Sequence, residues 1–304
     1  MPSPTSTDNE QRTPSSGSPA HHVPAHLYWL TRLVQMPLMA LATAFFGTIS
    51  LLCGLWDRSG RQQHLVARAW AGVMLRFALS PVELIGLENV PGKQSPGAPF
   101  MERNDMSGKE ELAGAPFVSG RKDAHGWDEN VPAVYASNHL SYMDTPVLFA
   151  RLPFQFRILA KQGLWKIPFV GWYLARSGQV PIDSSSSRSA VAGLLRGVAA
   201  LKSGMPLVVF PEGARSPSGG LQAMASGAAF MAIRAGVPLV PVALIGTYQL
   251  LPIHVYALRP RPLKVVIGQP LPTAGLTTRD ADALTSRLYA AISQLYYTHS
   301  EPTA

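Results

Sequence analysis

The sequence predicts an α/β fold: a mixed, mostly parallel sheet flanked by helices, with an N-terminal membrane-anchoring helical segment. Three observations support this prediction. From residue 133 onward, short β-branched runs alternate with stretches of helical apolar spacing, as in sheets that are buried on both faces. Polar motifs follow two of the strands, where α/β sheets place their ligands. Near the N-terminus, residues 33–56 form an uncharged segment of 24 residues.

The expected elements follow from the apolar runs and their spacing. The last helix has Thr278 as its N-cap, acidic residues in its first turn and one apolar face, so we expect it to pack against the sheet. The predicted strands are 134–136, 207–210, 239–245 and 265–267, and the predicted helices are 189–201, 227–235 and about 278–297.

The N-terminal part reads as a tail followed by a membrane anchor. Residues 1–27 are rich in Pro, Ser, Thr and His and are expected to be disordered. The segment Leu33–Trp56 would span about 36 Å as a helix, enough to cross a bilayer core of about 30 Å. A membrane-spanning or re-entrant anchor is the favoured interpretation, and a buried core helix is the alternative.

A second helix is expected over residues 61–79, which completes an anchoring segment over residues 28–80. His64, Arg68 and Arg76 recur at multiples of four on an otherwise apolar helix. Such a basic stripe suits a helix that lies on lipid headgroups. A core helix with one solvated edge fits the pattern equally well.

Residues 92–130 form a polar, Gly-rich segment without sustained periodicity. A loop of this length inside a compact domain is uncommon. We therefore predict that it is a disordered insertion.

Composition and charge narrow the function classes. The 304 residues carry a net charge of +8, yet only 14% of them are charged, against roughly 25% in soluble domains. Residues 131–304 hold 15 basic and 6 acidic side chains, which suits anionic lipid or a phosphorylated substrate. No nucleic-acid-binding motif accompanies this charge, and we expect no nucleic-acid partner. The single cysteine, Cys53, excludes a disulfide framework and a multi-cysteine metal site.

The first polar motif is Asn138-His139-Leu140-Ser141-Tyr142-Met143-Asp144, directly after a predicted strand. His139 and Asp144 can meet if the chain turns between them, with Ser141 capping a new helix. A carboxylate on one imidazole nitrogen fixes the tautomer and favours the imidazolium that forms when the other nitrogen takes a proton. A strand-end histidine with an ordinary capping aspartate fits the spacing as well.

The second motif is Phe210-Pro211-Glu212-Gly213-Ala214-Arg215-Ser216, again directly after a strand. Glycine lets a ligand approach the backbone, and arginine binds phosphate through two donors. Glu212 is placed to hold Arg215 or a ligand hydroxyl. Taken alone, the motif also fits a turn closed by a Glu212–Arg215 ion pair.

Together the two motifs resemble the glycerolipid acyltransferase family, which includes the 1-acylglycerol-3-phosphate acyltransferases. That family has an Asn-His-x-Ser-x-x-Asp block (its HX4D motif) and, about seventy residues later, a Phe-Pro-Glu-Gly-Thr-Arg-Ser block. Residues 178–183 and 237–242 resemble its intermediate and fourth blocks. The resemblance covers roughly residues 28–91 and 132–272, within an expected acyltransferase domain of residues 81–304.

Two departures from the family pattern concern the acceptor. Ser184 stands where the family usually has an arginine that helps to bind the acceptor phosphate. Arg188 or Arg176 is a candidate substitute, or the acceptor carries a different headgroup. Ala214 replaces the usual threonine of the third block.

The resemblance implies transfer of an acyl group from acyl-CoA or acyl-carrier protein to a lysophospholipid hydroxyl, most simply 1-acylglycerol-3-phosphate, to give phosphatidic acid in phospholipid biosynthesis. It implies that His139 is the general base and that Asp144 orients it. Binding of the acceptor would fall to a group of polar residues. No cofactor or metal is implied, and the catalytic domain is expected on the cytoplasmic face of a membrane. The implied substrate-binding residues are Glu212, Gly213, Arg215, Ser216 and Arg188.

Several interpretations remain open. The apolar run 164–174 fits an acyl-chain groove, a membrane contact or core packing, and Lys161 fits a phosphate contact or a solvated lysine. A serine hydrolase would need a Gly-x-Ser-x-Gly elbow, which the sequence lacks. A non-catalytic lipid-binding protein has no need of His139 and Asp144. A different lyso-lipid acceptor is the main rival within the acyltransferase interpretation.

Overall fold

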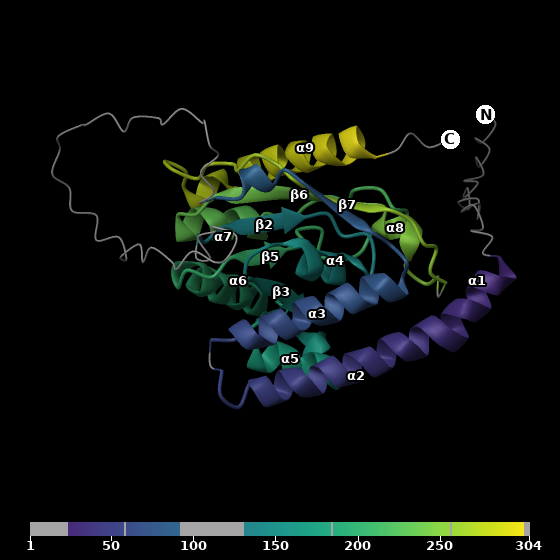
Figure 1. Ribbon diagram of the computed structural model, residues 1–304. Helices are drawn as coiled ribbons and strands as arrows, with labels where there is room; N and C mark the ends of the chain where they lie inside the picture. Colours follow the sequence, from purple (N-terminus) through teal and green to yellow (C-terminus); the bar gives the residue numbers. More distant parts are fainter. Residues whose placement is uncertain (1–23, 58, 92–130, 184, 256, 301–304) are drawn as a thin grey trace, which may run out of the picture.

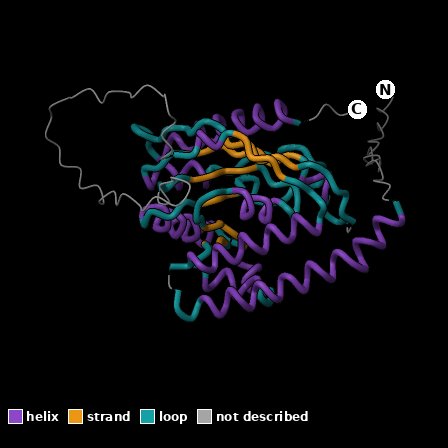
Figure 2. The backbone as a smooth tube through the Cα atoms, viewed as in Figure 1, coloured by secondary structure: helices purple, strands orange, loops and turns teal. Residues whose placement is uncertain are grey.

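The computed structural model describes residues 24–57, 59–91, 131–183, 185–255 and 257–300. Within these residues, seven strands form one sheet in the order β1-β7-β6-β2-β5-β3-β4. Strand β6 pairs with β7 in the antiparallel direction, and the other neighbours are parallel. Helices cover both faces of this sheet (Figures 1 and 2). The predicted mixed, mostly parallel α/β sheet is therefore confirmed.

The elements have the following bounds. The strands are β1 Val82–Ile85, β2 Val134–Ser137, β3 Arg157–Lys161, β4 Val180–Ile182, β5 Leu207–Val209, β6 Leu239–Ile245 and β7 Leu263–Ile267. The α-helices are α1 Ala25–Leu30, α2 Met36–Cys53, α3 Arg61–Phe77, α4 Asp144–Arg151, α5 Val170–Arg176, α6 Ser187–Lys202, α7 Gly227–Ala235, α8 Thr247–Leu250 and α9 Ala281–His299. A π-helical turn Thr31–Gln35 joins α1 to α2, and short 3-10 turns lie at Leu87–Asn89, Gln162–Lys166 and Thr278–Asp280.

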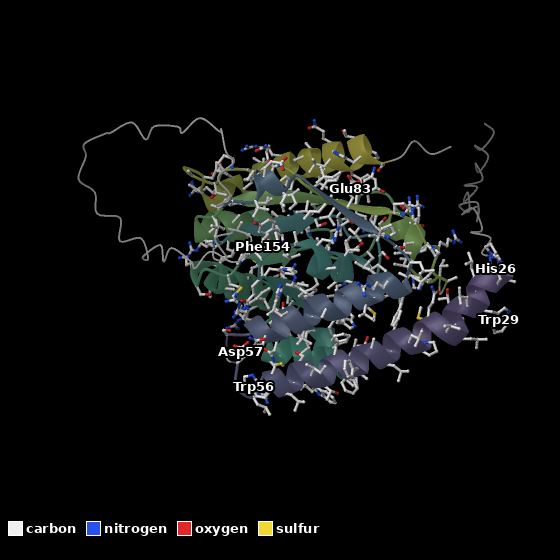
Figure 3. The ribbon with its side chains drawn as sticks, viewed as in Figure 1. His26, Trp29, Trp56, Asp57, Glu83 and Phe154 are labelled. Carbon is white, nitrogen blue, oxygen red and sulfur yellow. The ribbon has the colours of Figure 1, made fainter. Side chains whose placement is uncertain are left out.

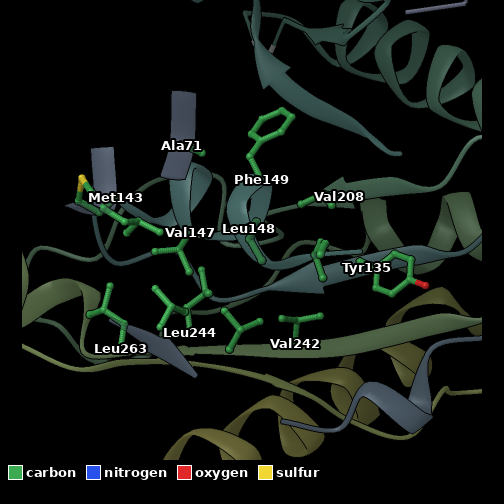
Figure 4. Packing of buried hydrophobic residues seen from close by; sticks show 14 of the residues in the cluster. Ala71, Tyr135, Met143, Val147, Leu148, Phe149, Val208, Val242, Leu244 and Leu263 are labelled. Atoms are coloured by element: carbon green, nitrogen blue, oxygen red, sulfur yellow. The ribbon is translucent and has the colours of Figure 1, made fainter. Parts of the chain in front are cut away.

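Successive side chains of the central strands point alternately into two hydrophobic cores, one on each face of the sheet. Tyr135 and Val208 pack with Phe149 and Leu148 of α4 and with residues of α3 on one face (Figure 4). Their sequence neighbours Val134 and Leu207 are buried on the other face, against α6, α7 and α9. Because consecutive strand residues point to opposite faces, an uninterrupted apolar run is what such a doubly covered sheet requires. The packing of the last helix against the sheet is confirmed.

The N-terminal helix runs continuously from Ala25 to Cys53 and is long and apolar enough to cross a membrane. Only 6% of its most apolar window is buried inside the protein. Trp29 near its start and Trp56 just beyond its end are both exposed and lie far apart along this segment (Figure 3). Helices α3 and α5 contact α2 along one side. The structure thus favours the anchor over the buried core helix, and this exposed apolar helix suggests membrane association.

Helix α3 packs into the protein interior. It does not present the exposed basic stripe that was expected to lie on lipid headgroups. His64 is buried between the rings of Phe149 and Phe156, with centroids 5.4 Å and 4.9 Å away. Burial, together with the nearby Arg68 guanidinium, lowers the pKa of His64 to about 4, so this imidazole is uncharged at neutral pH. The buried histidine removes one member of the expected stripe and makes α3 a core helix with a solvated edge.

The structure also corrects several local predictions. The edge strands β1 and β4 and the next-to-edge strand β3 were not predicted, because most of their side chains are only partly buried. The 3-10 turn before α9 is capped by Thr277, whose hydroxyl pairs with the Asp280 carboxylate at 2.8 Å, and not by Thr278. Helix α1 begins at Ala25, inside the expected tail. The rest of that tail, residues 1–23, and the expected insertion at 92–130 lie outside the described residues.

Candidate active site

His139 and Asp144 meet at the end of strand β2, as the spacing of the motif predicts. The imidazole Nδ1 of His139 lies 2.8 Å from Oδ2 of Asp144. The same oxygen accepts the backbone N–H groups of Leu140 and Ser141 at 2.6 Å and 2.8 Å. Asp144 is fully buried, whereas the His139 side chain keeps 16% of its surface exposed. The carboxylate therefore holds Nδ1 and leaves the opposite ring nitrogen, Nε2, as the one free to exchange a proton.

The residues around this pair fix the turn. The Asn138 side chain bridges to strand β6, donating to the Leu244 carbonyl at 2.9 Å and accepting its N–H at 2.7 Å. The Ser141 hydroxyl donates to the Leu251 carbonyl at 2.8 Å. It does not cap helix α4 as predicted, because the N-cap position is Met143. Both side chains shape the loop through contacts with segments more than a hundred residues away.

The second motif lies beside the first, after the neighbouring strand β5. The backbone N–H of Ser216 donates to the His139 carbonyl at 2.8 Å, which ties the two loops together. Gly213 closes the turn at a φ of +70°, and a Cβ there would meet no atom within 4 Å. Glycine is required for this backbone conformation, and the space above it is open to a ligand. The Ser216 side chain is fully buried, so its hydroxyl faces the protein interior.

Glu212 is partly buried and held by Gln222. The Gln222 amide donates to Glu212 Oε2 at 3.0 Å and to the Ala214 carbonyl at 2.9 Å. Burial raises the pKa of the Glu212 carboxyl to about 7, against smaller opposing effects of hydrogen bonds from Gln222 and the His139 backbone. The other oxygen, Oε1, is buried and has no hydrogen-bond partner. That atom can carry the proton of the carboxyl group itself.

The predicted Glu212–Arg215 ion pair does not form between these two described side chains. Arg215 instead places its guanidinium carbon 3.8 Å from the centroid of the Tyr142 ring, which belongs to the first motif. Its charge therefore stays available next to His139. Sequence reasoning did not find this pairing, because nothing in the spacing of the two motifs specifies which side chains stack.

The remaining predicted cations lie farther along the same edge of the sheet. Arg188 is exposed in the first turn of α6 and makes no hydrogen bond or ion pair with another described residue. It follows β4, which lies three strands from β2 in the sheet. Lys161 is exposed at the end of β3, which is closer to the two motifs. Ser184 lies outside the described residues.

An apolar cavity opens beside the start of helix α4. Together with its open mouth it encloses about 760 Å³ of empty space. Thr145, the residue after Asp144 in sequence, is part of its wall, whereas His139 and Asp144 do not line it. Half of the apolar run 164–174 contributes to the lining. The lining includes Phe46 and Gly47 of α2, Trp70 of α3, Ala160 of β3, and Leu164, Phe169, Val170, Tyr173 and Leu174.

Within the described ranges, no three His, Cys, Asp or Glu side chains gather into a group that could hold a metal ion. The polar groups near His139 are a carboxylic acid of raised pKa, a guanidinium and backbone N–H groups. This set of groups suits proton transfer and the binding of an anionic ligand.

Comparison with known proteins finds a matching family model. This model, described as acyltransferase, matches residues 108–245, which contain both motifs. Over these residues the chain is similar to the acyltransferase family. The match includes residues 108–130, which the structure does not describe.

Curated relatives are similar to this chain over part of their length. A chloroplastic 1-acyl-sn-glycerol-3-phosphate acyltransferase of Brassica napus is 30% identical over 199 residues, 65% of this chain and 47% of that protein. A 1-acyl-sn-glycerol-3-phosphate acyltransferase of Pseudomonas aeruginosa is 32% identical over 170 residues, 55% of this chain and 65% of that protein. The chain spans about half the length of the first curated relatives it matches.

A solved structure has the same fold. The crystal structure of the 1-acyl-sn-glycerophosphate (LPA) acyltransferase from Thermotoga maritima matches with a TM-score of 0.65 and 22% sequence identity. The match covers 88% of this chain and 93% of that one. The chain therefore shares the fold of that structure over most of its length.

Proposed function

We propose that the protein transfers a fatty acyl group from a thioester donor, acyl-CoA or acyl-carrier protein, to the free hydroxyl of a lysophospholipid. The observation that carries this proposal is the 2.8 Å contact between His139 and the buried Asp144, next to a guanidinium and an apolar cavity. The favoured acceptor is 1-acylglycerol-3-phosphate, which would give phosphatidic acid. The names of the relatives support this choice.

The chemistry follows from the available proton acceptor. Nε2 of His139 takes the proton of the acceptor hydroxyl as its oxygen attacks the thioester carbonyl carbon. The negative charge of Asp144 stabilises the imidazolium that results. The tetrahedral intermediate collapses, the C–S bond breaks, and the departing thiolate takes the proton from His139. Donor and acceptor thus exchange acyl group and proton, and His139 returns to its starting state.

The surrounding groups position the two substrates. Arg215 is placed to bind the acceptor phosphate, and we propose that the Glu212 carboxyl helps to position a hydroxyl of the glycerol backbone. Binding energy at these groups holds the reacting hydroxyl near His139. We assign Ser216 a positioning role through its backbone N–H, because its hydroxyl is buried. The cavity beside Thr145 is lined mostly by apolar side chains, which suit an acyl chain. We propose that it binds the acyl chain of the donor.

A different lyso-lipid acceptor remains the second candidate. Ser184 stands where the family usually has an arginine, and Arg188 is exposed three strands away from β2 in the sheet. An acceptor whose headgroup carries less negative charge, and so needs fewer cationic side chains to bind it, fits these two observations. Activity that is greatest with a zwitterionic lysophospholipid or a lyso-aminolipid would favour it.

The decisive experiment is an acceptor panel with one acyl-CoA donor and detergent-purified protein, in which the release of CoA is followed. We expect turnover with 1-acylglycerol-3-phosphate and its loss in the His139→Ala variant. His299→Ala, at the end of α9, is the matched control and should keep full activity. Full activity of His139→Ala would refute the proposed base, and absence of turnover with every acceptor would favour a non-catalytic lipid-binding protein.

We also propose that residues 28–80 anchor the catalytic part at the cytoplasmic face of a membrane. Arg58, Arg61 and Arg68 follow the uncharged segment 33–56 closely, whereas Arg12 and Arg32 precede it. Positive residues flanking a span favour the cytoplasmic side. Protease digestion of a C-terminal tag in sealed membrane vesicles of known orientation tests this. A tag that is protected in vesicles whose cytoplasmic face is outside would refute the assignment.

A further inference from the structure

The guanidinium of Arg215 lies flat against an aromatic ring that the proposed reaction does not use. Its carbon atom is 3.8 Å from the centroid of the Tyr142 ring, well inside the roughly 6 Å range of cation–π attraction. Tyr142 comes from the loop after β2, and Arg215 comes from the loop after β5. The contact therefore joins the loop of the proposed base to the loop of the proposed phosphate-binding residue.

The ring is a fixed platform even though 49% of the Tyr142 side chain is exposed. Its two sequence neighbours are buried and hydrogen-bonded. The Ser141 backbone N–H donates to Asp144 Oδ2 at 2.8 Å, and the Met143 N–H donates to the Ser141 hydroxyl at 3.2 Å. The backbone of Tyr142 is therefore held between two anchored residues. Its ring projects from the same turn that orients His139.

Stacking leaves the guanidinium free to bind an anion. Neither Glu212 nor any other described carboxylate forms an ion pair with Arg215, so its charge is not neutralised within this part of the protein. The N–H donors of a guanidinium point outward in the plane of the group. A ring against one face therefore leaves the edge of the guanidinium accessible to two phosphate oxygens at once.

We propose that Tyr142 is a positioning residue that holds Arg215 in the orientation that binds the acceptor phosphate. The inference rests on the proposed function and extends it to a residue outside the implied catalytic and substrate-binding set. Without the ring, the long arginine side chain samples many rotamers, and ordering it on binding costs affinity. The proton transfer at His139 does not depend on the stack. Loss of Tyr142 is therefore expected to act on acceptor binding rather than on the chemical step.

A double-mutant cycle tests this role. We expect Tyr142→Leu to raise KM for 1-acylglycerol-3-phosphate several-fold with kcat little changed, and Arg215→Ala to raise KM by more. In the Arg215→Ala background, adding Tyr142→Leu should have no further effect, because the ring then has no guanidinium to hold. Tyr142→Phe keeps the aromatic face and should restore KM to near the wild-type value. Tyr289→Leu, an exposed tyrosine on α9, is the control for the loss of a surface ring.

Two results would overturn the proposal. Multiplicative effects of Tyr142→Leu and Arg215→Ala on KM would mean that Tyr142 acts independently of Arg215. A fall in kcat with KM unchanged would assign Tyr142 to the turn around His139 instead. The melting temperature of each variant shows whether it has lost structure in general. Tyr142→Phe serves as the folded reference for this comparison. Wild-type protein inactive with every acceptor would refute the proposed function itself, whereas an active wild type with multiplicative effects refutes only the role of Tyr142.

Discussion

The ring of Phe210 lies parallel to the imidazole of His139, with their centroids 4.0 Å apart and an interplanar angle of 17°. Phe210 begins the second motif, and His139 belongs to the first. The stacked ring restricts the imidazole on one side while Asp144 holds its Nδ1. The π face also favours the positive charge that the imidazolium acquires during proton transfer. Phe210 thus helps to hold the imidazole of His139, the proposed base, in position.

We expect Phe210→Leu to lower kcat about 3- to 10-fold, which is the size of a lost cation–π contribution of ~0.5–1 kcal/mol with some added mobility of the imidazole. Phe210→Tyr keeps the ring and should stay close to the wild type. Steady-state kinetics over a range of pH measure both effects. A kcat for Phe210→Leu equal to that of the wild type across this range would show that the stack does not affect the base.

Asp144→Asn is expected to reduce kcat by roughly 10³-fold, because a neutral amide lacks the negative charge that stabilises the imidazolium. The amide oxygen can still accept the N–H groups of Leu140 and Ser141, so the melting temperature should change little. Asp282→Asn, exposed in the first turn of α9, is the matched control. Activity of Asp144→Asn within a few-fold of the wild type would contradict the assigned role of this carboxylate.

The raised pKa of Glu212 predicts a specific pH dependence of stability. This carboxyl has an ordinary pKa of 4.5 and a folded-state pKa of about 7. Between these values the unfolded chain binds fewer protons than the folded protein, so the free energy of unfolding falls as pH rises. The contribution is complete below pH 4.5 and is lost above pH 7. Because solvent screens the partly buried carboxyl, its contribution to the free energy of unfolding is on the order of 2 kcal/mol.

Glu212→Gln removes this titration and tests the prediction. The variant and the wild type should be equally stable near pH 5, and the variant should be the more stable of the two near pH 8. Thermal or denaturant unfolding in detergent at both pH values measures the difference. Glu83→Gln, an exposed glutamate on β1, controls for the loss of one negative charge. A constant difference between Glu212→Gln and the wild type at the two pH values would contradict the assigned pKa.

The cavity beside helix α4 predicts a determinant of acyl-chain length. Ala160 of β3 is part of its wall. Ala160→Leu adds three carbon atoms and should shift the donor preference toward chains about two to three carbons shorter, at ~0.8 kcal/mol per methylene no longer buried. Competition between acyl-CoA donors of different length measures this shift. Ala199→Leu on the exposed side of α6 is the control, and an unchanged preference in Ala160→Leu would place the acyl chain elsewhere.

The central strands and helices were predictable because each is encoded by a pattern of apolar residues that are neighbours in the sequence. Strand β6 is a run of seven buried residues, and its apolar sequence identified it with both ends correct. Helix α7 was likewise predicted with both ends correct. The strands β1, β3 and β4 escaped prediction. Most of their side chains are only partly buried, so their sequences lack the uninterrupted apolar run of a central strand.

The same division applies to the candidate site. The spacing in the first motif predicted that His139 and Asp144 would meet, because five residues of one turn decide that contact. Glu212, three positions earlier in the motif, was one expected partner of Arg215, and the partner is the ring of Tyr142 instead. Gln222, which holds Glu212, had no signal in the sequence. These contacts depend on how separate loops face one another across the edge of the sheet.

The sequence by itself therefore determined the α/β class, the uncharged N-terminal helix and the two polar motifs that follow β2 and β5. Each of these is a property of neighbouring residues, set by apolar periodicity, glycine and capping groups. Only the tertiary structure decided that Phe210 stacks on His139, that Tyr142 carries Arg215 and that His64 is buried and neutral. Such contacts join residues tens of positions apart. The first two form because parallel strands bring their carboxyl ends to one edge of the sheet, and the third forms because helix α3 packs against α4.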